Sequence, residues 1–344
     1  MRNLLIIGAG NIINTRHLPA LKRHGDRFRI TGILDIHGDR AARTAAAFQI
    51  PYHAVYRSSL PDLPWVREAE AVIVGTPPKT HAAMIRAALQ SGKHVLTEKP
   101  FVTDLSEGTE LITMARRKNL ILAVNHNFQF SHAFSQLQTL IDCGALGKIR
   151  SLSCSQITND SRRLPVWADD LPMGLFYDET PHVFYLMRRF GGNIVIDHAY
   201  RVASMQKVNT PQILNVDLHA GVIPATITIN FESPVCEWYF TVFGTKQFAA
   251  VDMFRDILIV LPNDGQHLMK EVFRTSALAT WQHWRGVVSN GVQYLRHNLF
   301  YGIDRVHARF DDAVSGNPDA IAGISAADGL DVNRAQWDVI GNIG

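Results

Sequence analysis

Strand-length apolar runs alternate with helical segments along the first third of this 344-residue chain, and this alternation limits the fold more than any other feature. The run at 3–8, NLLIIG, is continuously apolar, as expected of a strand buried on both faces of a parallel sheet. Similar runs follow at 28–35, 71–78, 93–98 and 120–125, with helical periodicity between them. Strands that alternate with helices predict βαβ units in a doubly wound parallel sheet.

The chain changes in character after residue 125. Its later segments are, in order, a helix at 131–144, a helix around 174–190, a row of strand-like runs between 194 and 262, and helical patterns at 277–314 and within 326–340. Strands collected in a row favour an antiparallel or mixed sheet. We therefore predict an α/β domain at 1–124 and an α+β domain with an open-faced, largely antiparallel sheet at 125–344.

The composition argues against several classes of function. Lys and Arg number 34 against 31 Asp and Glu, for a net charge of +3, and they are scattered, which argues against a nucleic-acid partner. Cys143, Cys154 and Cys236 are too few and too dispersed for a disulfide framework or a zinc site, so we expect no metal. The apolar N-terminal run is only as long as a strand, which is short for a signal peptide or a membrane helix. We expect a cytoplasmic protein with no membrane partner.

A glycine pair follows the first predicted strand and precedes the first helix. Gly8 would make the tight turn, and Gly10 would let a pyrophosphate approach the helix N-terminus, beside Asn11 and Ile12. The third position of this dinucleotide fingerprint is Ile13 in place of Gly or Ala, which predicts looser packing of the helix on the strand. The turn indicates a dinucleotide cofactor; the alternative is a plain βα turn.

Asp35 ends the second predicted strand, near the spacing at which a carboxylate meets the adenosine ribose. A carboxylate accepts hydrogen bonds from free ribose hydroxyls and repels a 2′-phosphate, which favours NAD over NADP. The nearby Arg40 and Arg43 keep NADP open as the alternative.

Lys99 stands in the stretch LTEKPF, at the end of a predicted strand and directly before Pro100. Proline restricts the residue before it to an extended backbone, so the flexible Lys99 side chain is attached to a conformationally restricted backbone. This predicts that the Lys99 ammonium has a role that requires accurate placement. The alternative is that Lys99 lies in a solvated turn. Asp178 and His182 are four residues apart, so on one helix they would project from the same face and the carboxylate would orient the imidazole.

Four motifs resemble, in order and spacing, the glucose–fructose oxidoreductase, inositol dehydrogenase and rhizopine-catabolism family (Gfo/Idh/MocA). They are GAGNIINTRHLPAL, GTPPKTH, EKP and DETPH, and the resemblance covers residues 1 to about 190. It implies a Rossmann domain followed by an open-faced sheet domain, with NAD(P) as cofactor. It also implies homodimers or homotetramers that associate through the outer face of the second sheet.

The resemblance assigns roles to individual residues. Thr76, Pro77 and His81 would line the cofactor, Glu98 would lie by the nicotinamide ribose, and Lys99 would be catalytic. Asp178 and His182 match the family's acidic residue and its histidine, which would act as the base because histidine titrates near neutral pH. The chain departs from the family pattern at Thr180, Tyr185 and Asn127.

Substrate contacts are expected from Asn125, His126 and Trp167, together with Asp178 and His182. The alternative for Trp167 is a role in packing the protein interior. Arg162 and Arg163 would either hold an anionic group of the substrate or lie in a solvated loop. The aromatic stretch at 281–301 is either core or a nucleotide-sugar subsite.

The sequence therefore predicts an NAD(P)-dependent oxidoreductase that acts on a secondary hydroxyl or carbonyl group of a sugar, polyol or nucleotide sugar. Two alternatives stay open. One is a redox-neutral hydrolase or epimerase that oxidises its substrate transiently, and the other is a catalytically silent NAD-binding regulator.

Overall fold

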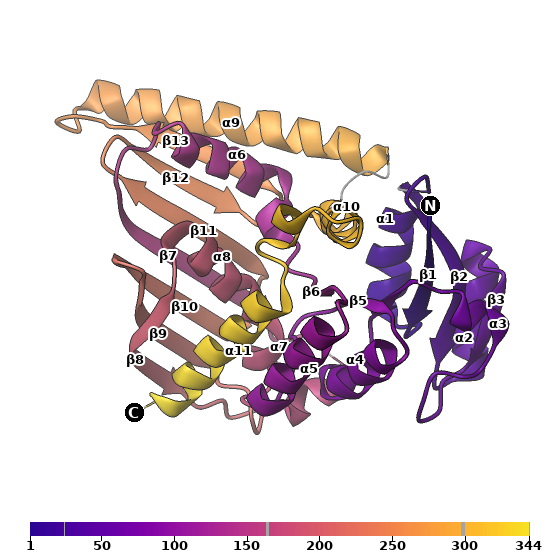
Figure 1. Cartoon of the computed structure of the whole chain (residues 1–344). Coiled ribbons are helices and arrows are strands. Elements are labelled where there is room, and N and C mark those ends of the chain that lie inside the picture. The colour runs from indigo at the N-terminus through magenta and orange to yellow at the C-terminus, as the bar shows by residue number, and fades with distance from the viewer. Residues whose placement is uncertain (24, 163–164, 297–299, 344) are drawn as a thin grey trace. The chain divides into compact units, whose positions relative to one another are not determined.

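The computed structural model describes residues 1–343 except 24, 163–164 and 297–299. The chain divides into two compact units, which are described separately (Figure 1). Unit 1 contains residues 1–127 and 303–334, and unit 2 contains residues 128–302 and 335–344.

Unit 1 is built on a six-stranded parallel sheet in the order β3-β2-β1-β4-β5-β6. Its strands are β1 (Arg2–Ile7), β2 (Phe28–Asp35), β3 (Tyr52–Val55), β4 (Ala71–Val74), β5 (His94–Thr97) and β6 (Leu122–Val124). Leu4 to Ile7 of β1 are almost fully buried, as the continuous apolar run predicts for a central strand. The predicted doubly wound parallel sheet is confirmed.

Helices follow the strands of unit 1 in the predicted alternation. They are η1 (Ile13–His17), α1 (Leu18–Arg23), α2 (Gly38–Phe48), α3 (Pro64–Arg67), η2 (Pro78–Thr80), α4 (His81–Gln90) and α5 (Leu105–Arg117). The helix after the glycine turn passes through a π-helical stretch, η1, before it continues as α1. Asp104 caps α5 by accepting the Ser106 N–H at 2.7 Å.

Residues 303–334 pack into unit 1, whereas the sequence predicts a single boundary at residue 124. This segment contains α10 (Ile303–Val314), η5 (Pro318–Ile321) and the first half of α11 (Ala326–Gly341). Val306 and Phe310 of α10 are fully buried, and Leu330 of α11 joins the apolar cluster that contains Phe101 and Val124. The units therefore differ from the predicted domains because an apolar C-terminal segment returns to the first sheet.

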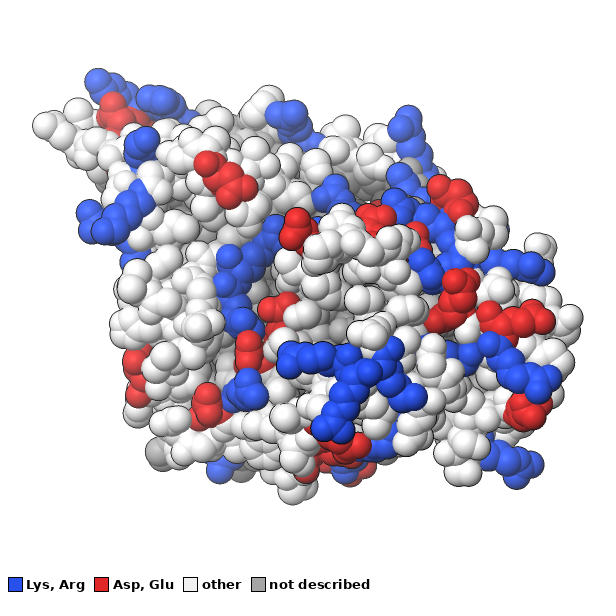
Figure 2. Space-filling model, viewed as in Figure 1, with Lys and Arg blue, Asp and Glu red and all other residues white. Residues whose placement is uncertain are grey.

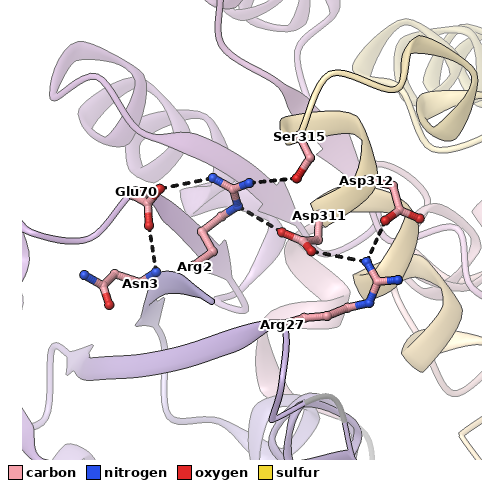
Figure 3. Close-up of polar contacts among 7 residues, drawn as sticks. All are labelled: Arg2, Asn3, Arg27, Glu70, Asp311, Asp312 and Ser315. Carbon is pink, nitrogen blue, oxygen red and sulfur yellow. Dashed lines mark hydrogen bonds and ion pairs between the residues drawn. The ribbon is translucent and has the colours of Figure 1, made fainter.

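An ion-pair network holds α10 against the strands of unit 1 (Figure 3). The Arg2 guanidinium donates to Asp311 at 3.0 Å, and the Arg27 guanidinium donates to Asp312 at 2.6 Å and to Asp311 at 3.2 Å. Arg2 also pairs with Glu70 at 3.2 Å, which connects the start of β1 to the approach to β4. Hydrogen bonds to Asp312 and Asp311 hold the pKa of Arg27 above its ordinary value.

Unit 2 contains a seven-stranded mixed sheet in the order β13-β12-β11-β7-β10-β9-β8. Its strands are β7 (Ile149–Asn159), β8 (Ile194–Val202), β9 (Ile213–Ala220), β10 (Ile223–Ser233), β11 (Glu237–Gly244), β12 (Gln247–Asp252) and β13 (Ile257–Pro262). Only the β10–β7 pair is parallel among these ladders. Buried and exposed side chains alternate along β10, so one face of the sheet is covered and the other is open. This confirms the predicted open-faced, mostly antiparallel sheet.

The helices of unit 2 are η3 (Phe128–Phe130), α6 (His132–Asp142), η4 (Val166–Asp170), α7 (Leu175–Glu179), α8 (Pro181–Gly191) and α9 (Met269–Leu295), with the second half of α11. The predicted helical pattern at 277–314 is two helices, α9 and α10, and α9 begins earlier than predicted. Among the helices that the structure describes, none is both long and apolar enough to cross a lipid bilayer. The described residues also include no cluster of three or more His, Cys, Asp or Glu side chains that could hold a metal ion.

Candidate active site

The glycine turn after β1 has the steric properties that a dinucleotide site requires. Gly8 has φ +101°, and a Cβ there would lie 2.4 Å from the Gly75 carbonyl oxygen, so only glycine fits. A Cβ on Gly10 would meet no atom of the described chain closer than 4.0 Å. Glycine at position 10 thus leaves open space beside the start of the helix, where Asn11 and Ile12 form the first turn.

Ile13, the departure from the fingerprint, is accommodated by a glycine elsewhere. A Cβ on Gly75, directly after β4, would lie 2.5 Å from the Ile13 Cδ1 atom. Ile13 is fully buried, so its side chain occupies the room that Gly75 leaves. The expected looser packing is therefore wrong: the helix packs closely because the small residue is contributed by the β4 end.

Asp35 is buried at the end of β2 and holds the glycine turn in place. Its Oδ2 accepts the Ala9 N–H at 2.7 Å, and its Oδ1 accepts the His37 N–H at 2.8 Å. The Arg40 guanidinium lies 3.9 Å from Oδ2, while Arg43 pairs with Asp39 on the surface of α2. Of the two arginines expected to compete for a phosphate, only Arg40 is therefore next to Asp35.

His81 connects the two loops that the sequence assigns to the cofactor. Its Nδ1 lies 2.8 Å from the Pro100 carbonyl oxygen and its Nε2 lies 2.8 Å from the Thr76 carbonyl oxygen. Burial lowers the pKa of His81, and the hydrogen bonds to the two carbonyls oppose this effect. His81 is fully buried and would act through Thr76 and Pro100, while Pro77 is exposed on the loop.

Glu98 is the centre of a buried polar network at the carboxyl ends of β5 and β6. One oxygen, Oε1, lies 2.7 Å from the His17 Nε2 and accepts the Asn125 Nδ2–H at 2.7 Å. The other oxygen accepts the Lys99 backbone N–H at 3.1 Å. The Lys99–Pro100 peptide is cis. Glu98 therefore fixes the backbone that carries the Lys99 side chain.

The pKa of Glu98 reflects two opposing effects. Burial is the larger single effect and raises the pKa, but the hydrogen bond and charge of His17, the charge of Lys99 and the Asn125 hydrogen bond together lower it below its ordinary value. Glu98 is thus a buried carboxylate that stays ionised because its neighbours stabilise the charge.

Sequence reasoning missed two members of this network, His17 and His307. Both rings are fully buried, and the His17 Nδ1 lies 2.9 Å from the His307 Nε2. A histidine at an inward position of a helix carries no sequence signal that separates it from an ordinary core residue. His307 was also out of reach because it lies on α10, which the sequence places in the other domain.

Asn125 and His126 follow β6 and are both buried. Since the Asn125 Nδ2 donates to Glu98, the amide cannot flip without turning its oxygen toward a carboxylate. Within the described residues, the Asn125 Oδ1 is buried and has no hydrogen-bond partner. The His126 Nδ1 lies 3.1 Å from the Gly323 carbonyl oxygen, which anchors the ring to the returning C-terminal segment of unit 1.

Asp178 and His182 lie in unit 2 on two short helices and not on one. α7 ends at Glu179, and α8 begins at Pro181, whose missing N–H breaks the ladder. His182 is buried, and its Nδ1 lies 2.8 Å from the Tyr185 hydroxyl, which also accepts the Phe128 N–H at 3.0 Å. Tyr185, a departure from the family pattern, thus orients the imidazole.

The remaining predicted substrate residues lie in the same unit. Trp167 is half-buried in η4. Arg162 is exposed in a bend after β7, as expected of a loop residue, and its guanidinium forms an ion pair with the buried carboxylate of Glu179. Arg163 lies outside the described residues.

Three structural features of unit 1 are compatible with a bound dinucleotide. Gly10 leaves open space beside the start of the helix, Gly8 permits the tight turn, and the Asn125 Oδ1 is a buried acceptor that a ribose hydroxyl or a carboxamide could satisfy. Asp35, Thr76, Pro77, Glu98 and Lys99 all belong to the loops at the same ends of the parallel strands. Ligands of doubly wound sheets bind at these strand ends.

Comparison with known proteins supports this assignment. Residues 2–126 match the family model described as "Oxidoreductase family, NAD-binding Rossmann fold". The uncharacterised oxidoreductase YrbE of Bacillus subtilis is 27% identical over 264 residues, which is 73% of each chain. The dTDP-3,4-didehydro-2,6-dideoxy-alpha-D-glucose 3-reductase of Actinomadura kijaniata is 35% identical over 150 residues, or 44% of each chain. Among the first curated relatives other than YrbE, the match spans 34% to 44% of their length.

Solved structures share the fold over almost the whole chain. A UDP-N-acetylglucosamine 3-dehydrogenase from Acidithiobacillus ferrooxidans has a TM-score of 0.73 at 19% identity and covers 99% of this chain and 97% of its own. An oxidoreductase from Thermotoga maritima has a TM-score of 0.77 at 18% identity, with 99% and 96% covered. Residues 2–126 of this chain therefore match the Gfo/Idh/MocA oxidoreductase family through its NAD-binding Rossmann fold, and the solved structures share the fold of the chain.

Proposed function

We propose that the protein is an NAD-dependent dehydrogenase or reductase that transfers hydride between nicotinamide and a secondary hydroxyl or carbonyl group of a sugar, polyol or nucleotide sugar. The observation that carries the proposal is the buried Glu98 network, which anchors the Lys99 backbone and presents the unfilled Asn125 Oδ1. Both features lie at the strand ends where a dinucleotide fits.

Each proposed catalytic residue has one task. The bound nicotinamide would accept or donate the hydride. The Lys99 ammonium would stabilise negative charge on the reacting oxygen, which is why its backbone is fixed by Glu98. In the oxidative direction His182 would take the hydroxyl proton, with Tyr185 holding its Nδ1 and Asp178 contributing negative charge.

The relatives favour a sugar carried on a nucleotide. By their names, the Actinomadura kijaniata reductase acts at position 3 of a dTDP-linked sugar, and the Acidithiobacillus ferrooxidans enzyme is a 3-dehydrogenase of a UDP-linked sugar. UDP- and dTDP-sugars are therefore the first substrates to test, before free sugars and inositol.

Turnover measurements on the full chain test the proposal. We expect NADH to accumulate with at least one UDP- or dTDP-sugar or polyol. Lys99→Met should retain cofactor binding and lose about 10²- to 10⁴-fold in kcat, the range for loss of a positioned acid or base. His182→Asn should lose a similar factor.

Matched controls are the exposed residues Lys22→Met on α1 and His132→Asn on α6, which should retain full turnover. Near-normal kcat in Lys99→Met, with NAD affinity intact, would remove Lys99 from the mechanism. Product formation without accumulation of NADH would contradict a dehydrogenase and would instead support the redox-neutral hydrolase or epimerase.

A further inference from the structure

The 27-residue helix α9 exposes an apolar stripe that nothing in the proposed chemistry uses. The helix runs along β13, the edge strand of the unit 2 sheet (Figure 1), and none of its residues is fully buried. Its large apolar side chains are instead solvent-accessible: Phe273 is 70% exposed, Trp281 58%, Trp284 62%, Val288 63% and Leu295 77%. An apolar surface of this kind marks an interaction site.

The opposite side of α9 is fixed to the sheet, so the stripe cannot turn inward. The Gln282 side chain accepts the Val260 N–H at 2.8 Å and donates to the Val260 carbonyl at 2.9 Å, in the manner of a neighbouring strand. Gly286 faces Ile257, where a Cβ would come within 2.7 Å of the isoleucine side chain. Asn290 donates to the Asp256 carbonyl at 3.0 Å. These three residues recur every four positions and set the rotation of the helix.

The charges beside the stripe are mostly basic. Lys270, Arg274, Arg285 and Arg296 are exposed on α9 and its C-cap, and Glu271 is the only acidic residue from 269 to 296. Arg285 lies over the Trp281 ring, 5.4 Å from its centroid, so cation and aromatic share one surface. The upper edge of Figure 2, which corresponds to α9 in Figure 1, shows mostly uncharged side chains among which basic residues outnumber acidic ones.

We propose that α9 docks this protein on an anionic lipid surface, which departs from the expectation of no membrane partner. The helix would lie in the plane of the bilayer over about 40 Å, with Phe273, Trp281 and Trp284 at the headgroup level. The basic side chains would pair with lipid phosphates.

A second copy of the chain fits the stripe less well. An interface that paired α9 with α9 would bring Arg274, Arg285 and Arg296 of both copies together. The described residues of the helix offer Glu271 alone to offset this charge, and it lies toward the sheet side with its side chain 23% exposed. Anionic headgroups supply the missing negative charge along the whole helix.

Co-sedimentation with vesicles tests the proposal on the intact protein. We expect binding to vesicles of phosphatidylcholine with about one-third phosphatidylglycerol, little binding to phosphatidylcholine alone, and release at high salt, which screens the charges. Trp281→Gln with Trp284→Gln should weaken binding about tenfold or more, and so should Arg274→Gln with Arg285→Gln.

Two double variants serve as matched controls and should bind as the wild type does. Tyr239→Gln with Phe243→Gln removes two exposed aromatic side chains from the open face of the sheet. Arg57→Gln with Arg117→Gln removes two exposed charges from unit 1. Melting curves and NAD titrations establish that each variant is folded.

Three outcomes would overturn the proposal. One is no binding of the wild type to anionic vesicles, and another is equal binding to both lipid compositions. The third is an oligomer, seen by light scattering without lipid, that the tryptophan variant alone dissociates; a second copy would then cover the stripe. Each outcome is independent of turnover and leaves the proposed chemistry to its own test.

Discussion

Asp35 has two tasks in this structure, and a substitution can separate them. It holds the Ala9 and His37 backbone N–H groups, and its charge faces the place where an adenosine ribose would lie. We expect NAD to bind more tightly than NADP. Asp35→Asn keeps one accepting oxygen and removes the charge, so the ratio of NAD affinity to NADP affinity should fall by about tenfold or more.

Calorimetric titration of both cofactors into the apo protein measures this ratio. Asp39→Asn, an exposed change beside Arg43, is the control and should leave the ratio unaltered. A wild-type preference for NADP would mean that Arg40, 3.9 Å from Asp35, captures the 2′-phosphate and that the assignment of Asp35 is wrong.

Glu98 predicts a specific dependence of stability on pH. Because its folded pKa is lowered, the ionised group stabilises the fold above the unfolded value of about 4.3, and this contribution is lost as pH falls through the folded pKa. Glu98→Gln should therefore cost about 2 kcal/mol at pH 7, the scale of a charged hydrogen bond. The gap in melting temperature between wild type and variant should close as the pH falls below about 4.3.

Thermal melts from pH 7 downward provide the measurement, with the exposed Glu68→Gln as a control whose gap stays small throughout. A gap for Glu98→Gln that does not change with pH would mean that the residue acts through shape alone.

At the scale of elements, the contact between Ile13 and Gly75 joins the first helix to the end of β4. Gly75→Ala would place a methyl group 2.5 Å from the Ile13 side chain and should destabilise unit 1 by about 1–3 kcal/mol, as overpacking does. Ile13→Ala removes both the Cδ1 and the Cγ1 atoms, which lie 2.5 and 2.6 Å from that methyl position, so the double variant should lose less than the sum of the two single variants. Denaturant unfolding of the four proteins gives the coupling; additive losses would refute the contact.

Element types were predictable where the pattern was long. The central strands and the helices between them follow from continuous apolar runs and 3.6-residue periodicity. The edge strand β3 escaped prediction because it is only four residues long and largely exposed, so it shows neither an apolar run nor alternation. The break between α7 and α8 was signalled by Pro181, but the expected helical spacing of Asp178 and His182 overrode it.

At the scale of the whole molecule, the chain passes between the units three times, after residues 127, 302 and 334. Periodicity along a sequence does not state which sheet a helix packs on, so the return of 303–334 could not be predicted. The same limit hid His307, and with it the full extent of the Glu98 network.

This return predicts the behaviour of fragments. Residues 1–127 alone would expose apolar side chains that Val306, Phe310 and Leu330 cover, and should aggregate or bind a hydrophobic dye. Joining 1–127 to 303–334 through a flexible linker should restore a soluble, cooperatively melting protein that binds NAD. If 1–127 alone melts cooperatively and binds the cofactor, the C-terminal segment is not needed for that fold.

The exchange of a glycine between two positions also has an evolutionary consequence. Ile13 and Gly75 share one small volume, so the identity at one of these positions limits what selection can accept at the other, whereas Gly8 is fixed by its positive φ and by the Gly75 carbonyl oxygen. A lineage that carries glycine or alanine at position 13 would be free to enlarge position 75, and one that keeps isoleucine would not. Positions 13 and 75 should therefore covary. Sequence searches that require the third fingerprint glycine will overlook dinucleotide-binding chains in which the small residue lies after the neighbouring strand.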